Sequence, residues 1–84
     1  MKVYYITFRS VTYAQRGEKV LTREGIRCSL QRTPRWMESQ GCGYALRVWG
    51  QEIETARQLL QRSQVPLRRI YVQRDGGELE EMVL

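Results

Sequence analysis

Residues 26–49, IRCSLQRTPRWMESQGCGYALRVW, contain two strand patterns separated by a loop. The first pattern, residues 26–32, alternates apolar and polar side chains, as a strand with one buried face does. The second, residues 42–49, alternates in the same way, and residues 33–41 hold the Pro, Ser and Gly that are typical of an exposed loop. The side chains predicted to face the core are Ile26, Cys28, Leu30, Tyr44, Leu46 and Val48. Two consecutive strands are therefore expected in the middle of the chain.

The segments on either side of this pair each supply one strand and one helix. Residues 2–8, KVYYITF, are rich in the aromatic and β-branched types that favour a strand. A helix is expected to begin after Ser10, its N-cap, and to end at Gly25. A second amphipathic helix is expected over residues 51–63, and a last strand over residues 68–74.

The order strand, helix, strand, strand, helix, strand predicts an α+β fold. With right-handed crossovers it gives a ferredoxin-like βαββαβ sandwich, in which two helices cover one face of a four-stranded antiparallel sheet. A chain of 84 residues can supply only one core, so we expect a single domain over residues 1–74. Residues 75–84 are expected to form an acidic C-terminal tail that is either disordered or adds a short extra strand.

Charge is distributed unevenly along the chain. Residues 1–74 hold all 14 Lys and Arg and five of the acids, a net charge of +9, whereas the other four acids lie in the last ten residues. A basic body favours an anionic partner such as RNA, a phosphate or an acidic protein. The alternative is that these charges simply keep the surface solvated.

Several classes of protein are disfavoured by composition. No apolar run approaches the roughly 18 residues that span a bilayer, and the first residues lack the pattern of a secretory signal, so we expect a soluble, cytoplasmic protein with no membrane partner. Two Cys and no His cannot supply a four-ligand zinc site within one chain, and we expect neither a metal nor a cofactor. Without His, no Cys–His pair can activate a nucleophile, which favours a carrier or binding protein over an enzyme.

Cys42 lies between two glycines, just where the third strand begins. In the expected topology this point lies beside the start of the first helix, whose N–H groups stabilise an anion such as a thiolate. Arginines lower the pKa of a nearby thiol, so Cys42 is a candidate reacting group; the alternative is that Gly-Cys-Gly only shapes the start of the strand. The residues predicted to form a site with Cys42 are Ser10, Arg35, Ser39, Gly43 and Arg47.

Cys28, in contrast to Cys42, is predicted to have a packing role. It alternates with Ile26 and Leu30, so we expect it to fill the core rather than to react. A disulfide to Cys42 is not expected, because the two cysteines lie toward opposite ends of the second strand and a disulfide needs Cα atoms within about 7 Å.

Several short motifs resemble one known family. They are Thr7-Phe8-x-Ser10, Glu24-Gly25-Ile26, Pro34-Arg35, Ser39, Cys42-Gly43 and Ala45-Leu46-Arg47. In this combination they are similar to small bacterial proteins, first grouped as a domain of unknown function and later labelled selenium/sulfur carrier-like. The resemblance covers residues 3–73. It implies a ferredoxin-like fold and a cysteine, here Cys42, that holds sulfur or selenium as a persulfide or selenosulfide, with a cysteine desulfurase or an enzyme of selenium metabolism as partner.

This chain departs from the family pattern in three ways: its strong basicity, the longer segment after Arg74, and the additional residues Gln40 and Gly41 before the cysteine. Two other functions stay open. Tyr5, Trp49 and Tyr71 among arginines would suit an RNA-binding sheet face. The same three aromatic side chains would equally suit the interface of a dimeric regulatory module, so both a monomer and a homodimer are considered.

Overall fold

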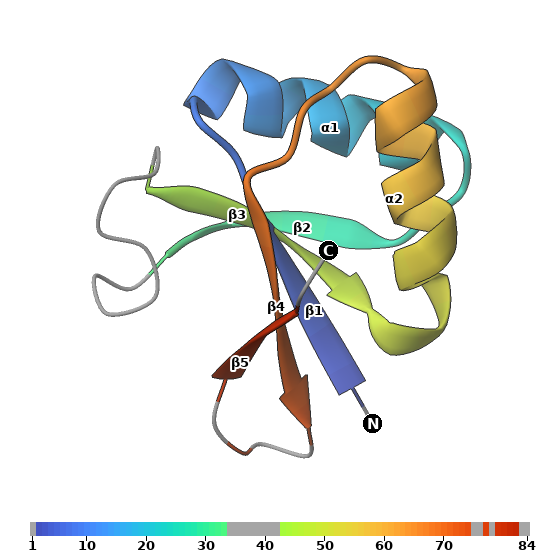
Figure 1. The fold of residues 1–84 in the computed structure, drawn as a ribbon. Coiled ribbons are helices and arrows are strands. Elements are labelled where there is room, and N and C mark those ends of the chain that lie inside the picture. The colour runs from blue at the N-terminus through green and yellow to red at the C-terminus, as the bar shows by residue number, and fades with distance from the viewer. Residues whose placement is uncertain (1, 34–42, 75–76, 78, 83–84) are drawn as a thin grey trace.

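A computed structural model describes residues 2–33, 43–74, 77 and 79–82 of the chain, and it is drawn in Figure 1. Two α-helices and five β-strands follow the predicted order, with one additional strand at the end. In chain order the elements are β1 Lys2–Thr7, α1 Val11–Arg23, β2 Cys28–Arg32, β3 Tyr44–Trp49, the 3₁₀ turn η1 Gly50–Glu52, α2 Ile53–Arg62, β4 Arg69–Arg74 and β5 Leu79–Met82. The first position of the expected third strand, residue 42, lies outside the described residues.

One sheet contains all five strands in the order β2-β3-β1-β4-β5, and every neighbouring pair is antiparallel. The register places Tyr5 of β1 opposite Arg47 of β3 on one side and opposite Tyr71 of β4 on the other. The predicted α+β class, the two helices and the antiparallel pairing are confirmed.

The prediction of a four-stranded sheet is wrong, because β5 adds a fifth strand beside β4. The chain reverses direction at Gly77, whose N–H donates to the Arg74 carbonyl at 2.7 Å and whose carbonyl accepts from the Gln73 side chain at 2.9 Å. Met82 then packs against the core although the two residues before it are glutamates. Part of the predicted acidic tail therefore belongs to the sheet.

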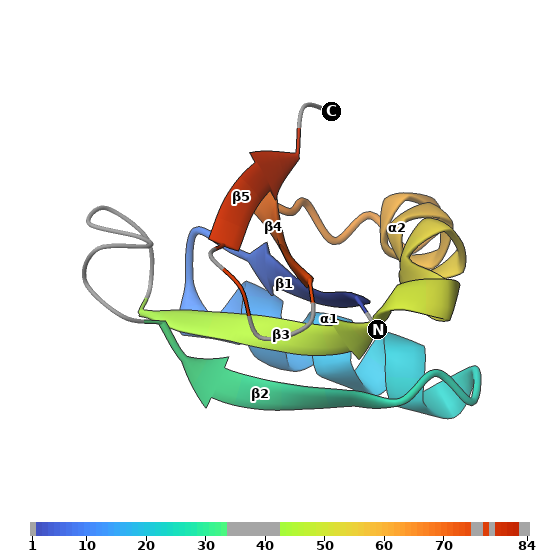
Figure 2. The same cartoon turned by 90° about the horizontal axis from the view of Figure 1, so that it is seen from below.

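The core lies between one face of the sheet and the two helices, which lie on the same side of it (Figures 1 and 2). Alternate residues of β1, β3 and β4 point into it, as their sequence period predicts. Its buried members are Tyr4, Ile6, Phe8, Ala14, Leu21, Ile26, Leu46, Val48, Ile53, Ala56, Leu60, Val65, Ile70 and Val72. Cys28 is half-buried against this cluster, as predicted.

Phe8 follows β1 and is fully buried where α1 crosses the sheet. Gly17 of α1 lies directly over it, because a Cβ added at Gly17 would come within 3.1 Å of the Phe8 ring and 3.2 Å of Leu46. The missing side chain lets the helix approach the sheet closely. None of the helices in the described part of the chain is both long and apolar enough to cross a membrane.

Candidate functional site

The candidate site lies at one end of the sheet, which we call the Gly43 end: β1 finishes there, and β3 and β4 begin there. The register pairs Thr7, the last residue of β1, with Ala45 of β3 and with Arg69 of β4. Continued by two positions, the β1–β3 register brings Gly43 to the level of Arg9 and the start of α1. The structure thus brings Gly43 and Ser10 to the same end of the sheet, as the sequence predicts.

Ser10 caps α1 in the predicted way. Its backbone is extended, with φ −140°, and its Oγ accepts a hydrogen bond from the N–H of Tyr13 at 3.2 Å. This bond satisfies one of the N–H groups that every helix leaves unpaired in its first turn. The remaining partial positive charge of the helix start is directed toward the Gly43 end.

Gly43 holds a backbone conformation that suits only glycine well. Its φ is +85°, and its carbonyl accepts a hydrogen bond from the N–H of Thr33 at 2.9 Å. A Cβ at this position would meet no atom within 4 Å, so the requirement for glycine comes from the dihedral angle and not from crowding. The Cys-Gly pair therefore has a conformational reason for its second member.

Replacing Gly43 with Ala should lower the free energy of unfolding by about 1–2 kcal/mol, because an L-residue with positive φ brings its Cβ against its own carbonyl. Urea titration of both proteins measures the difference. Gly25, φ +81°, also has an open Cβ position, so Gly25→Ala is the matched control with a similar expected loss. An unchanged urea midpoint for Gly43→Ala would contradict this account of the Cys-Gly pair.

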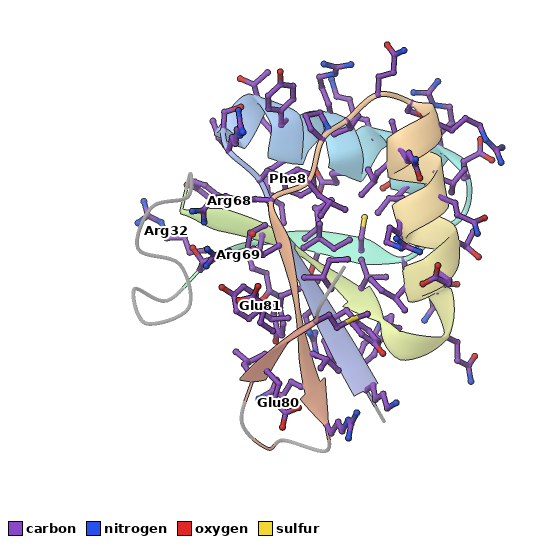
Figure 3. All side chains as sticks on the ribbon, viewed as in Figure 1. Phe8, Arg32, Arg68, Arg69, Glu80 and Glu81 are labelled. Atoms are coloured by element: carbon purple, nitrogen blue, oxygen red, sulfur yellow. The ribbon has the colours of Figure 1, made fainter. Side chains whose placement is uncertain are left out.

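Four arginines surround the Gly43 end, and sequence analysis did not single them out: Arg9, Arg32, Arg68 and Arg69. Each lies within two residues of a strand boundary, as the bounds of β1, β2 and β4 show. The side chains of Arg32, Arg68 and Arg69 gather on the side of the molecule where β3 begins (Figure 3). We call these four residues the arginine rim. The sequence feature that they share is a basic residue within two positions of a strand boundary.

The environment of the arginine rim is not uniform. The Arg32 guanidinium lies 5.6 Å from the centroid of the Tyr44 ring, and Arg68 is half-buried. The neighbouring Tyr71 hydroxyl, through a hydrogen bond, and the Glu81 carboxylate both raise the pKa of Arg69. The rim therefore presents a field that favours an anion, reduced on the β5 side by Glu81.

Arg47 lies away from this end. It projects from the sheet face opposite the helices, and its Cζ lies 4.7 Å from the centroid of the Trp49 ring. It is four positions along the chain from Gly43, about 13 Å in an extended strand. Its Nε is buried without a hydrogen-bond partner among the described residues. It lines a surface hollow of about 490 Å³ together with Arg27, Cys28 and Trp49.

The other predicted members of the site, Cys42, Arg35 and Ser39, lie outside the described residues. Their roles therefore stay predictions. Of the predicted set, the structure places Ser10 and Gly43 at the same end of the sheet, whereas Arg47 lies further along, within β3.

Cys28, the other cysteine, has the surroundings of an unreactive thiol. Its Sγ lies 3.8 Å from Thr22 Oγ1 and 4.0 Å from the Glu18 carbonyl oxygen, to which it donates. Burial raises the pKa of the Cys28 thiol, the Thr22 hydrogen bond opposes that rise, and the charges of Glu18 and Glu52 add to it. At neutral pH this thiol stays protonated and is a poor nucleophile.

The raised pKa of Cys28 predicts a loss of stability in alkali. A thiol in the unfolded chain ionises at about pH 8.5, so above that pH the unfolded state loses its proton first and the free energy of unfolding falls. Below that pH the contribution is fully present. Urea titrations at pH 7 and pH 10 should show a smaller alkaline loss for Cys28→Ser than for the wild type. An equal loss in both proteins would exclude Cys28 as its cause.

The sheet face away from the helices carries Tyr5, Trp49 and Tyr71, as the alternation predicts. Trp49 is 37% exposed, whereas Tyr71 is only 8% exposed. Stacking of successive nucleic-acid bases needs open ring faces, and Tyr71 offers little of its ring. This face therefore presents one well-exposed aromatic ring beside a guanidinium, rather than a continuous aromatic surface.

The described residues contain no group of three or more His, Cys, Asp or Glu side chains arranged as a metal site. These features define a small α+β protein with a five-stranded antiparallel sheet, a glycine-dependent strand start and an arginine rim around it. The chain belongs to the family described as "Putative Se/S carrier protein-like", whose sequence model matches residues 3–72. The resemblance based on the short motifs is thereby confirmed. Comparison with curated proteins gave no match, and comparison with solved structures gave none.

Proposed function

We propose that this protein carries sulfur or selenium on Cys42, as a persulfide or a selenosulfide. The observation that carries the proposal is the arginine rim at the Gly43 end, the same end of the sheet as the residue that follows Cys42 in the chain. Family membership supports the carrier class. Positive charge and a helix start favour a thiolate, which is the nucleophilic form of cysteine.

The loading step needs no added oxidant or reductant. The Cys42 thiolate attacks the terminal sulfur of a donor enzyme's cysteine persulfide and forms a new S–S bond. The donor's S–S bond breaks, and its cysteine leaves as a thiolate. One sulfane sulfur has then moved between proteins, with the electrons and the proton count conserved.

We further propose that the first four strands and the two helices form a ferredoxin-like unit to which β5 is added. The sequence of pairs β2-β3-β1-β4 supports this assignment. We place the protein in the cytoplasm, with a cysteine desulfurase or an enzyme of selenium metabolism as the donor. The arginine rim suits a donor whose active-site surface is acidic.

Intact-mass analysis tests the carrier function directly. After incubation with a cysteine desulfurase and cysteine, the wild type should gain the mass of one sulfur atom, and reduction should remove it. Cys42→Ser should show no gain. Cys28→Ser is the matched control and should load as the wild type does, because the Cys28 thiol is half-buried with a raised pKa. Loading that survives in Cys42→Ser, or that never occurs in the wild type with either sulfur or selenium donors, would overturn the proposal.

A further inference from the structure

β2 is the outermost strand on one side of the sheet (Figure 2). The direction of its backbone groups follows from one bond, in which the Thr33 N–H donates to the Gly43 carbonyl at 2.9 Å. In an antiparallel ladder, bonded and non-bonded pairs alternate, so Gln31 and Ser29 also direct their N–H and C=O groups toward β3. The backbone groups of Cys28, Leu30 and Arg32 therefore point away from the sheet. These groups have no hydrogen-bond partner within the described part of the chain.

This edge is complementary to itself. If two copies of β2 pair antiparallel about Leu30, then Leu30 faces Leu30, and Cys28 faces Arg32 of the other copy. On the other face, Ser29 lies opposite Gln31, and both are polar. The backbone groups of Cys28, Leu30 and Arg32, which point away from β3, would all form hydrogen bonds with the second copy. No two like charges would lie directly opposite each other.

The other edge of the sheet behaves differently. If β5, Leu79–Met82, paired antiparallel with itself about Glu80 or about Glu81, that glutamate would lie opposite its own counterpart in the other copy. Like charges in directly opposed positions destabilise a strand pair. Pairing of β2 with β5 of a second copy would leave one edge free at each end and would generate an open chain of molecules instead of a closed pair.

Charge also favours β2. Arg32, exposed at the end of the strand, would face the start of the second copy's β2. Two carboxylates lie near that point: Glu52 accepts a hydrogen bond from the Arg27 N–H at 3.3 Å, and the charges of both Glu18 and Glu52 act on the Cys28 thiol. A free edge that offers unpaired backbone groups, an apolar centre and opposite charges at its two ends has the requirements of a two-fold strand pair.

We propose that β2 pairs antiparallel with β2 of a second copy of this chain, about a two-fold axis at Leu30, to form a continuous ten-stranded sheet. The pairing uses residues 28–32, of which only Arg32 also belongs to the arginine rim. It requires no sulfur on Cys42, so it does not depend on the carrier function. The contact involves one short strand from each copy. It is therefore expected to be concentration-dependent.

Oxidative cross-linking tests the register. In a background with Cys28→Ser and Cys42→Ser, Leu30→Cys should form a covalent dimer, because paired Cα atoms in a bonded position lie about 5.5 Å apart, within the range of a disulfide. Ser29→Cys is the matched control, since its partner is Gln31 and not itself, and it should remain monomeric. A mixture of Ser29→Cys and Gln31→Cys proteins should cross-link. Cross-linking of Ser29→Cys alone as efficiently as Leu30→Cys would overturn the register.

Sedimentation equilibrium tests the association itself. The wild type should approach twice its mass of 10.0 kDa as its concentration rises. Arg32→Glu should raise the dimer dissociation constant about tenfold or more, and the added change Glu18→Arg should restore much of the affinity. A mass that stays at 10.0 kDa at every concentration, or an Arg32→Glu protein that associates as the wild type does, would overturn the proposal. Neither cross-linking nor sedimentation requires sulfur on Cys42. Failure of the carrier function would therefore leave both results unaffected.

Discussion

Phe8→Ala should lower the free energy of unfolding by about 3–5 kcal/mol, the usual cost of removing a fully buried aromatic ring. Phe8 is 0% exposed, and its ring supports α1 at the point where Gly17 brings the helix close to the sheet. The closely packed neighbours Leu46 and Leu60 cannot collapse fully into the space that the ring leaves. A small domain has a total stability of about 5–15 kcal/mol, so this change approaches the limit of folding. Urea unfolding, followed by circular dichroism, measures the loss.

Val11→Ala is the control for this prediction, because it also shortens an apolar side chain near the start of α1. Val11 is 38% exposed, although its sequence position suggests the buried side of the helix. Its replacement should change stability by less than about 0.5 kcal/mol. Equal losses for Phe8→Ala and Val11→Ala would mean that the core is not centred on Phe8.

Reversing two charges of the arginine rim should raise the pKa of Cys42. In the double variant Arg9→Glu, Arg69→Glu, two positive charges near the Gly43 end become negative. We expect a rise of about one pKa unit, which reduces the thiolate fraction at pH 7 about tenfold. A more basic thiolate is also a better nucleophile, so the rate of reaction with an aromatic disulfide should fall by only about threefold. The dependence of this rate on pH gives the pKa itself.

The matched control is Arg23→Glu, Arg27→Glu. It makes the same change in net charge at the opposite end of the sheet, where α1 ends and β2 begins. Salt screens exposed charges over about 10 Å at 0.1 M, so the distant pair should leave the pKa of Cys42 nearly unchanged. If both double variants shift the pKa equally, the rim has no special relation to Cys42.

Alternation was enough to predict the central strands, because their buried residues are strongly apolar. The side chains of Ile70 and Val72 in β4, and of Leu46 and Val48 in β3, face the core as their period of two requires. Alternation does not predict β5, and an extra strand was only one of two alternatives for residues 75–84. Two of its four residues are glutamates, and its place depends on hydrogen bonds to β4 that no local pattern reveals.

For the site, features that depend on neighbouring residues were predicted correctly, whereas those that depend on how distant segments pack were not. Ser10 is recognisable as an N-cap from its residue type, and Gly43 as a glycine next to a strand. Arg47 was predicted to lie near Cys42, but a strand extends the chain and places Arg47 about 13 Å from Gly43, four positions away. The arginine rim forms only when the fold brings the ends of β1, β2 and β4 together. No local sequence pattern therefore predicts which arginines belong to it.

β1 occupies the middle of the sheet, and one of its two neighbours is β4, which begins more than sixty residues later in the chain. The Arg69 N–H, for example, donates to Thr7 Oγ1 at 3.1 Å, although the two residues are 62 positions apart. During synthesis, β1 leaves the ribosome well before β4 has been made, so one side of β1 stays unpaired until then. Pairing over such long stretches of chain is intrinsically slow. Fragments that stop before residue 69 would keep this side exposed, and we expect them to aggregate or to be degraded rather than to fold.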